Sequence, residues 1–528
     1  MKTSPWFTRN RFFSILRIAS AGVLISAAAA MAVLAASSGS PKIVGTALSV
    51  AAPDDAAATS DLITPACTAP TADPSGTVKT YAWYHCYTPT DIRTAYGVNS
   101  IADPTSGDGT GQTLGQGQTI VLVDSYGSPT AARDLKVFHD TFYPNLPNPN
   151  FTQVFPNGQP NFANPVSNGG SGPSAAAGWS GEATLDIEWS YAIAPLAHII
   201  LIAVPPAETE GVQGFPNLFK AISDQIDANP AGTVFSMSFG VTEQTFGGAA
   251  RSQTAKFDAV FQKGIAKGDT FFASSGDDGS LGVAKQHKES TAYSFPTDGW
   301  PASSPYVTAV GGTQLQYNWT WAPISDTPFL PDGSPNPDYF AYTAGGNLNV
   351  VWNETWLPAA TGGGPSAIYS RPTWQDGVQG VVGSARGVPD VSWNAAVNGG
   401  VLVYITAFPT AQRAGWHVYG GTSASSPQVA ALTALANQER AAANKAPLGN
   451  INPAIYSNTS WFTDVVAHTE GTAASGMLQN NQLWQYNADG SVSPGPVAGW
   501  PTLVGYDLTN GLGTPMAATY VSGLAGLP

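Results

Sequence analysis

The stretch "QTIVLVDS", from Gln118 to Ser125, joins an apolar, β-branched run to a polar tip. A short continuous apolar run of this kind is typical of a strand that is buried on both faces. Four later stretches share this character: "AHIILIAVP" (197–205), "TVFSMSFG" (233–240), "DTFFASSG" (269–276) and "YVTAVGG" (306–312). The stretch at 118–125 is therefore expected to be one of several strands in the core of one sheet.

Helical patterns separate these strands along the chain. They are "GEATLDIEWSYAIA" (181–194), "NLFKAISDQIDA" (217–228) and "AKFDAVFQKGIAKG" (255–268). This alternation predicts an α/β fold with a mostly parallel, doubly wound sheet and helices on both faces. In such sheets functional residues collect at the C-terminal ends of the strands. Two later regions, about 317–365 and 470–500, are rich in Gly, Pro, Asn and Trp. We expect them to be long surface loops.

Composition and the N-terminal residues indicate where the protein works. Acidic residues outnumber basic residues 35 to 21, a formal net charge of −14 that argues against nucleic acid as a partner. Residues 1–36 combine basic residues, an apolar run and a small-residue exit, which predicts a signal peptide and secretion. The alternative is a retained membrane anchor. No later segment is apolar enough to span a bilayer, so we expect no membrane association after signal removal.

Residues 37–86 are expected to form a short Ala/Ser/Pro-rich segment with a flexible leader, ahead of one globular domain over 87–528. Cys67 and Cys86 are the only cysteines. Export makes a disulfide between them plausible, and two free thiols are the alternative.

"GGTSASSP" (420–427) places Ser423 after two glycines and a threonine, just before an alanine-rich helical stretch. A serine hydroxyl there is a candidate nucleophile, but it needs a base beside it. Histidine is the usual base. None of the six histidines (85, 139, 198, 287, 417 and 468) lies in a recognisable catalytic motif.

Carboxylates are the alternative bases. Glu182 and Asp186 are four residues apart, so they share one face of the predicted helix, whereas Glu188 points elsewhere. They could enter a polar cleft, or they could form a solvated acidic face near a helix N-terminus. Asp277, in "SSGDDGS" (274–280), follows an apolar strand, and a simple turn explains that stretch equally well.

The ordered set "GEATLD", "SSGDDG" and "GGTSASSP" resembles the sedolisin family of serine-carboxyl peptidases, which have a subtilisin-like fold. "YTPTDIRTAYGV" (87–98), "FPTDGWPASSPYVTAVGGTQL" (295–315) and "RGVPDVSWNA" (386–395) are similar too, so the likeness covers about residues 87–520. It implies a secreted acid endopeptidase that acts on proteins or peptides, and we expect a monomer. It also implies Ser423 as nucleophile, Glu182 as general base and acid, Asp186 as its partner, and Asp277 as oxyanion donor.

The resemblance also implies one structural Ca²⁺. Asp464, Val465, Gly505 and Asp507 match the family's ligand pattern, with Leu503 standing where relatives have glycine. Backbone carbonyl ligands survive such a change if the backbone keeps its angle. Without the resemblance, both segments read as ordinary surface loops.

Other features depart from the family or leave alternatives open. No conventional prodomain fits between the signal peptide and residue 87, Phe239 replaces a frequent Trp, and Asp278 follows Asp277 where many relatives have Ser. A second acid at 278 is expected to raise the pKa of Asp277. A subtilisin Ser-His-Asp triad that includes Asp124 is an alternative. A non-catalytic protein that binds peptides or surfaces on a peptidase fold is a further alternative.

Overall fold

The computed structural model describes residues 48–51, 86–162, 173–205, 208, 212–286, 289–323, 340–354, 358–407, 415–467, 479–487 and 492–528. The predicted signal peptide (1–36), most of the predicted leader and Cys67 lie outside the described residues. Cys86 is disulfide-bonded. Within the described part, no helix has both the length and the apolar character needed to cross a bilayer.

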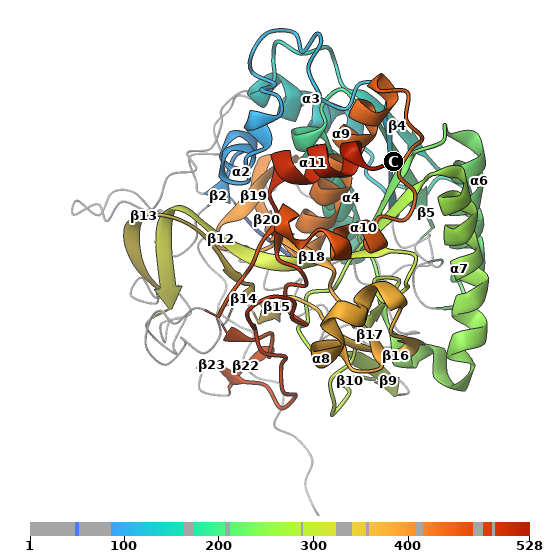
Figure 1. The fold of residues 1–528 in the computed structure, drawn as a ribbon, viewed down its shortest axis with the longest axis vertical. Coiled ribbons are helices and arrows are strands. Elements are labelled where there is room, and N and C mark those ends of the chain that lie inside the picture. Colours follow the sequence, from blue (N-terminus) through green and yellow to red (C-terminus); the bar gives the residue numbers. More distant parts are fainter. Residues whose placement is uncertain are drawn as a thin grey trace, which may run out of the picture.

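A mostly parallel sheet forms the centre of the molecule (Figure 1). Its strands run in the order β4, β5, β3, β6, β8, β12, β13, and β18 also pairs with β12. Only the β12–β13 pair is antiparallel. The bounds are β3 Thr119–Ser125, β4 Asn150–Val154, β5 His198–Val204, β6 Val234–Met237, β8 Thr270–Ser274, β12 Thr308–Pro323, β13 Phe340–Val351 and β18 Val391–Asn394. The predicted fold class is confirmed.

Helices cover both faces of this sheet. One face carries α3 (Ala131–Phe142), α4 (Pro173–Ile193), α9 (Thr422–Ala442) and α11 (Ala517–Gly526). The other carries α6 (Phe215–Ala228) and α7 (Ala250–Lys267), which lie at the right of Figure 1. The short helices are α2 (Pro89–Ala95), α8 (Gln379–Val382) and α10 (Asn452–Ser457).

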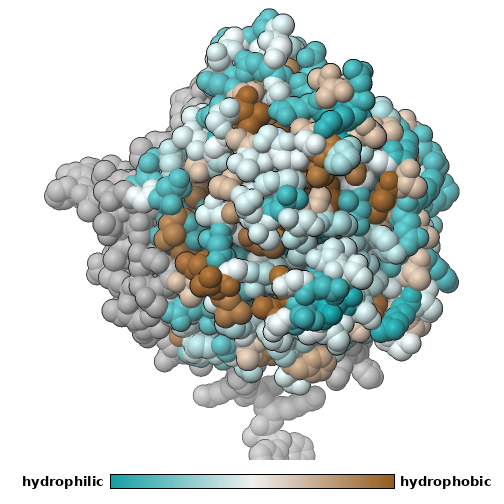
Figure 2. Space-filling model, in the orientation of Figure 1, coloured by the Kyte–Doolittle hydropathy of each residue, from teal (hydrophilic) through white to brown (hydrophobic). Residues whose placement is uncertain are grey.

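The side chains of β3 alternate between the two cores. Ile120 and Leu122 pack with the core of α4 and α9, whereas Val121 and Val123 pack with that of α6 and α7. Because successive strand side chains point to opposite faces, a continuous apolar run fills both cores. Burying each such side chain contributes about 1.5–3 kcal/mol. On the face shown in Figure 2, most of the surface is hydrophilic or neutral, and the hydrophobic areas are small.

A second sheet lies beside α3 and α4, in the order β1, β20, β19, β2. Its strands are β1 Leu48–Ala51, β2 Cys86–Tyr87, β19 Gly400–Ile405 and β20 Gly415–Gly420. β1 falls within the segment that was expected to be a flexible leader. It pairs antiparallel with β20 and places Leu48 opposite Gly420.

Two-stranded pairs occupy much of the remaining described chain. They are β7 (Val241–Thr242) with β11 (Gly299–Trp300), β9 (Val283–Gln286) with β10 (Glu289–Ala292), β14 (Asn353–Glu354) with β15 (Ala359–Ala360), β16 (Gly364–Ser370) with β17 (Ala385–Val388), β21 (Phe462–Thr463) with β24 (Thr514–Pro515), and β22 (Trp484–Tyr486) with β23 (Val492–Pro494). The expectation of surface loops is wrong for most of the described part of 317–365, which lies in β12 to β16, whereas β22 and β23 are the only strands in the described part of 470–500.

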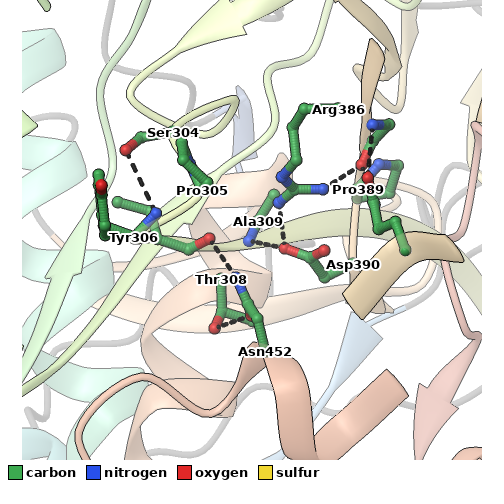
Figure 3. A network of polar contacts seen from close by, with 12 residues as sticks. Ser304, Pro305, Tyr306, Thr308, Ala309, Arg386, Pro389, Asp390 and Asn452 are labelled. Carbon is green, nitrogen blue, oxygen red and sulfur yellow. Dashed lines mark hydrogen bonds and ion pairs between the residues drawn. The ribbon is translucent and has the colours of Figure 1, made fainter. Parts of the chain in front are cut away.

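A buried ion pair joins Arg386 of β17 to Asp390, the residue before β18 (Figure 3). Arg386 donates to Asp390 at 2.5 Å, and neither side chain is exposed. The Asp390 carboxylate also accepts from the backbone N–H of Ala309 and from the hydroxyl of Tyr456, each at 2.8 Å. The guanidinium lies 4.9 Å from the ring centre of Trp374. These contacts offset the desolvation of both charges.

Replacing Arg386 with alanine is expected to lower the free energy of unfolding by about 3–5 kcal/mol, because Asp390 then keeps a buried charge without its partner. Arg371→Ala is the control, since Arg371 pairs with Asp376 at the surface and such pairs contribute about 1 kcal/mol or less. Urea denaturation at pH 5 measures both. Equal losses for the two variants would contradict the assigned role of the buried pair.

Candidate active site

Ser423 lies in the first turn of α9, and two glycines make its position possible. Gly421 has a φ of 98°, a value that favours glycine, and its N–H donates to the carbonyl of Ala395 at 2.6 Å. A Cβ on Gly420 would lie only 2.5 Å from that same carbonyl oxygen. The "GGTS" sequence thus lets the chain turn sharply from β20 into the helix and brings Ser423 to the positive end of α9.

Asp277 follows β8 and contacts the residue before Ser423. Its Oδ1 accepts from both the backbone N–H and the hydroxyl of Thr422, each at 2.8 Å. Its Oδ2 is buried and has no hydrogen-bond partner among the residues that the structure describes. A carboxyl group held through one oxygen leaves the other available to carry a proton and donate it.

The pKa of Asp277 is raised well above that of an ordinary aspartate, first by burial. The bonds from Thr422 lower it, and the charges of Asp278 and Glu182 raise it. The neighbouring acid at 278 thus acts in the expected direction, although burial is the larger cause. The interaction with Glu182 also indicates that Asp277 and Glu182 belong to one cluster of charges.

Glu182 and Asp186 are buried in the middle of α4, with 1% and 0% of their surface exposed. α4 begins at Pro173, not near Gly181 as expected, so neither residue lies in its first turn. The alternative of a solvated acidic face at a helix N-terminus is therefore wrong. Glu188 does point elsewhere, because its carboxylate accepts the backbone N–H of Tyr404 at 2.9 Å.

Asp124, at the end of β3, is a third carboxyl group in this cluster. The pKa of Asp186 is raised well above its ordinary value by burial and then by the charges of Asp124 and Glu182. Burial also raises the pKa of Asp124, to about 8. Sequence reasoning considered Asp124 only as part of a histidine triad. Its position at a strand tip was the signal that could have linked it to the acid pair.

The histidines whose hydrogen bonds are described lie in other surroundings. His139 bonds to the Tyr191 hydroxyl at 2.6 Å, and His198 to the Thr152 hydroxyl at 3.0 Å. His417 lies on β20 opposite Val403 of β19. His85, His287 and His468 are outside the described residues. Nothing in these contacts favours a Ser-His-Asp triad with Asp124.

The residues expected to bind calcium come from two loops that touch. Asp464 accepts the backbone N–H of Gly505 at 2.8 Å, and Asp507 accepts that of Leu503 at 2.9 Å. Val465 and Asp507 are buried, whereas Asp464, Leu503 and Gly505 are exposed. Burial raises the pKa of Asp507 to about 6, so a cation beside it would stabilise its charged form. Two carboxylates and nearby backbone carbonyls fit the oxygen chemistry of Ca²⁺.

Comparison with known proteins gives three kinds of match. The model of the subtilase family matches residues 172–483. Kumamolisin from Bacillus sp. (strain MN-32) is 29% identical over 70% of this chain and 55% of its own length. Sedolisin from Pseudomonas sp. (strain 101) is 30% identical over 51% of this chain and 40% of its own length. This chain therefore spans about half of these curated relatives, or less.

The fold is also similar to a solved structure. Pseudomonas sedolisin, a serine-carboxyl proteinase complexed with two molecules of pseudo-iodotyrostatin, matches with a TM-score of 0.55 and 24% identity. The match covers 83% of this chain and 98% of that chain. This likeness supports the subtilisin-like architecture of the two-faced central sheet.

The buried carboxyl cluster predicts that stability falls as pH rises. An unfolded aspartate has a pKa near 4, and that of Asp124 in the folded protein is about 8. Between these two pH values the folded state binds more protons than the unfolded state. The contribution of Asp124 to the free energy of unfolding is therefore fully present below about pH 4 and is lost as pH rises through about 8. The free energy of unfolding should fall with rising pH less steeply in Asp124→Asn than in the wild type, by ~1 kcal/mol per pH unit in this window. Urea denaturation at pH 4.5, 6 and 7.5 measures the slope.

Asp227→Asn is the control for this measurement, because the Asp227 side chain is 66% exposed and pairs with Lys263 at the surface. It should leave the slope unchanged. A wild-type protein that grows more stable from pH 4.5 to 7.5, or an Asp124→Asn variant with the wild-type slope, would contradict the assignment.

Proposed function

The chain belongs to the subtilase family. We propose that it is a secreted serine-carboxyl peptidase that hydrolyses peptide bonds in acid. The observation that carries this proposal is the position of Asp277, which accepts the backbone N–H of Thr422 beside Ser423 and interacts electrostatically with Glu182 of the Glu182–Asp186 pair. The similarity to kumamolisin and sedolisin supports the same reaction class. Protein or peptide substrates follow from that class.

In the proposed reaction the Ser423 hydroxyl attacks the carbonyl carbon of the scissile peptide bond and gives its proton to the Glu182 carboxylate. The oxyanion that forms accepts hydrogen bonds from the protonated Oδ2 of Asp277 and from the backbone N–H of Ser423. Glu182 then donates its proton to the leaving amine, and an acyl-enzyme remains. In the second half Glu182 takes a proton from water, and the water oxygen attacks the ester carbonyl carbon. Glu182 then returns that proton to the Ser423 oxygen as the ester C–O bond breaks, which releases the acid product and restores Ser423 and the Glu182 carboxylate.

The surroundings of each group suit these roles. Asp186 interacts electrostatically with both Asp124 and Glu182, so a proton held on Asp186 would leave Glu182 ionised and able to act as a base. Burial keeps Asp277 protonated well above the ordinary pKa of aspartate, which an oxyanion donor requires. A carboxylate base has an ordinary pKa near 4.3 and works best near that pH. Both requirements favour activity at acidic pH.

One Ca²⁺ is part of the proposal. Asp464 and Asp507 would supply carboxylate oxygens, and Val465, Leu503 and Gly505 would supply backbone carbonyls. The ion would join the loop after β21 to the loop before β24 and reduce the repulsion between their charges. Its role here is structural, because these loops belong to the C-terminal part of the domain and contribute none of the four candidate catalytic side chains.

Ser423→Ala and Glu182→Gln should each lower kcat/KM by about 10³-fold or more at pH 4, because they remove the nucleophile and its base. The assay is hydrolysis of a mixed peptide library by the purified protein. Ser425→Ala is the matched control two residues along α9, since that hydroxyl bonds to the carbonyls of Trp393 and Asn394. Undiminished activity in Ser423→Ala or Glu182→Gln would refute the proposed roles.

Removal of calcium should lower the melting temperature. Chelator added after acid stripping leaves Asp464 and Asp507 without a cation, and ligand linkage then no longer stabilises the folded state. Scanning calorimetry at pH 5 in excess chelator and in 5–10 mM CaCl₂, which is about 5 to 100 times the Kd typical of extracellular sites, measures the effect. Asp464→Asn should lose the calcium-dependent shift. Equal melting temperatures with and without calcium would exclude the site.

A further inference from the structure

A close contact joins the strand before the nucleophile to the helix of the base. Tyr419 lies near the end of β20, and Gly181 lies on α4 immediately before Glu182. A Cβ added to Gly181 would lie 2.4 Å from the Tyr419 hydroxyl oxygen and 3.2 Å from the ring carbon that carries it. Both residues are buried. The tyrosine hydroxyl therefore packs directly on the bare backbone of Gly181.

The other end of the same helix face is fixed to the neighbouring strand, β19. Glu188 accepts the N–H of Tyr404 at 2.9 Å, and the Trp189 indole donates to the carbonyl of Leu402 at 2.8 Å. Gly181 and Glu188 are seven residues apart, about 10 Å along a helix and on the same face. The face that turns toward β19 and β20 is thus held at two separated points.

Glu182 and Asp186 lie about 100° and about 140° round the helix from Gly181. Any shift of the helix toward or away from β20 therefore moves both carboxyl groups relative to Ser423. β20 continues through Gly420 and Gly421 into α9, so Tyr419 is only four residues from the nucleophile. The contact between Tyr419 and Gly181 therefore links α4, which carries the candidate base, to β20, which leads directly into the helix of Ser423.

We propose that Tyr419 is a positioning residue, whose contact with Gly181 sets the distance between the Glu182 carboxylate and the Ser423 hydroxyl. The inference rests on the proposed peptidase function and adds one residue and one constraint to it. Gly181 is required here because only a residue without Cβ leaves room for the hydroxyl. A displacement of about 1 Å between reacting groups can cost up to 10²-fold in rate.

The test is a double-mutant cycle at pH 4 with the full chain and a peptide substrate. Gly181→Ala should lower kcat about 10-fold or more with little change in KM, because the new methyl group pushes α4 away from β20. Tyr419→Phe removes the oxygen at 2.4 Å and leaves the nearest ring carbon at 3.2 Å, which a shift of a few tenths of an ångström relieves. In the Tyr419→Phe background, Gly181→Ala should therefore lower kcat less than about 3-fold.

Gly178→Ala is the matched control three residues earlier on α4, because a Cβ there would meet nothing within 4 Å. It should leave kcat and the melting temperature at or above their wild-type values. The melting temperature of each variant shows whether a low kcat comes from a displaced base in a folded protein or from a protein that no longer folds. If the contact had only a structural role, Gly181→Ala would lower the melting temperature without a selective loss of kcat, and Tyr419→Phe would not restore kcat.

The outcomes distinguish this inference from the function on which it rests. If Gly181→Ala lowers kcat by the same factor in both backgrounds, or only changes KM, the positioning role is wrong while the peptidase assignment stands. If the wild type and Ser423→Ala hydrolyse the peptide equally, the proposed function is wrong, and the positioning role falls with it. Rescue of Gly181→Ala by Tyr419→Phe in an active enzyme supports both.

Discussion

The cost of burying carboxyl groups governs the candidate site. Asp124, Asp186 and Asp277 are each buried, and burial raises the pKa of each. An isolated carboxylate in a low-dielectric interior is so unfavourable that the group takes up a proton instead. The same protons would serve the chemistry, because an oxyanion donor must be protonated and a shared proton beside Glu182 frees that group to act as base. Stability and working pH are thus linked through one set of groups.

The fold brings these groups together from distant parts of the chain. Asp124 ends β3 and Asp277 follows β8, so both lie at the C-terminal edge of the parallel sheet, where such folds place their sites. α4 and α9 pack on one face of that sheet and contribute the acid pair and the serine. The second sheet then supports both helices through β19 and β20. The serine and the acid pair are therefore carried by helices, and Asp277 lies three residues after the end of β8.

The sequence allowed the main strands and the position of Asp277 to be predicted, because continuous apolar runs with polar tips are strong signals. The start of α4 was missed, since "PSAAAGWS" (173–180) begins with residues that also suit a loop. Proline at a first helical position followed by alanines was the overlooked signal. The proximity of Asp124 to Asp186 could not be predicted from spacing, because it depends on how α4 crosses β3. The contact between Tyr419 and Gly181 depends on packing in the same way.

The central claim is that Ser423 reacts with a carboxylate as its base and a protonated carboxyl group as an oxyanion donor. Its most direct test is the pH dependence of acyl-enzyme formation. A peptide ester mixed with the protein and quenched rapidly in acid gives the rate of acylation, and peptide mapping by mass spectrometry locates the acyl group. A carboxyl base and a protonated Asp277 predict acylation of Ser423 that is fastest near pH 4 and declines toward neutral pH. Acylation that rises toward pH 8, as a histidine base would give, or an acyl group elsewhere than on Ser423, would contradict this mechanism.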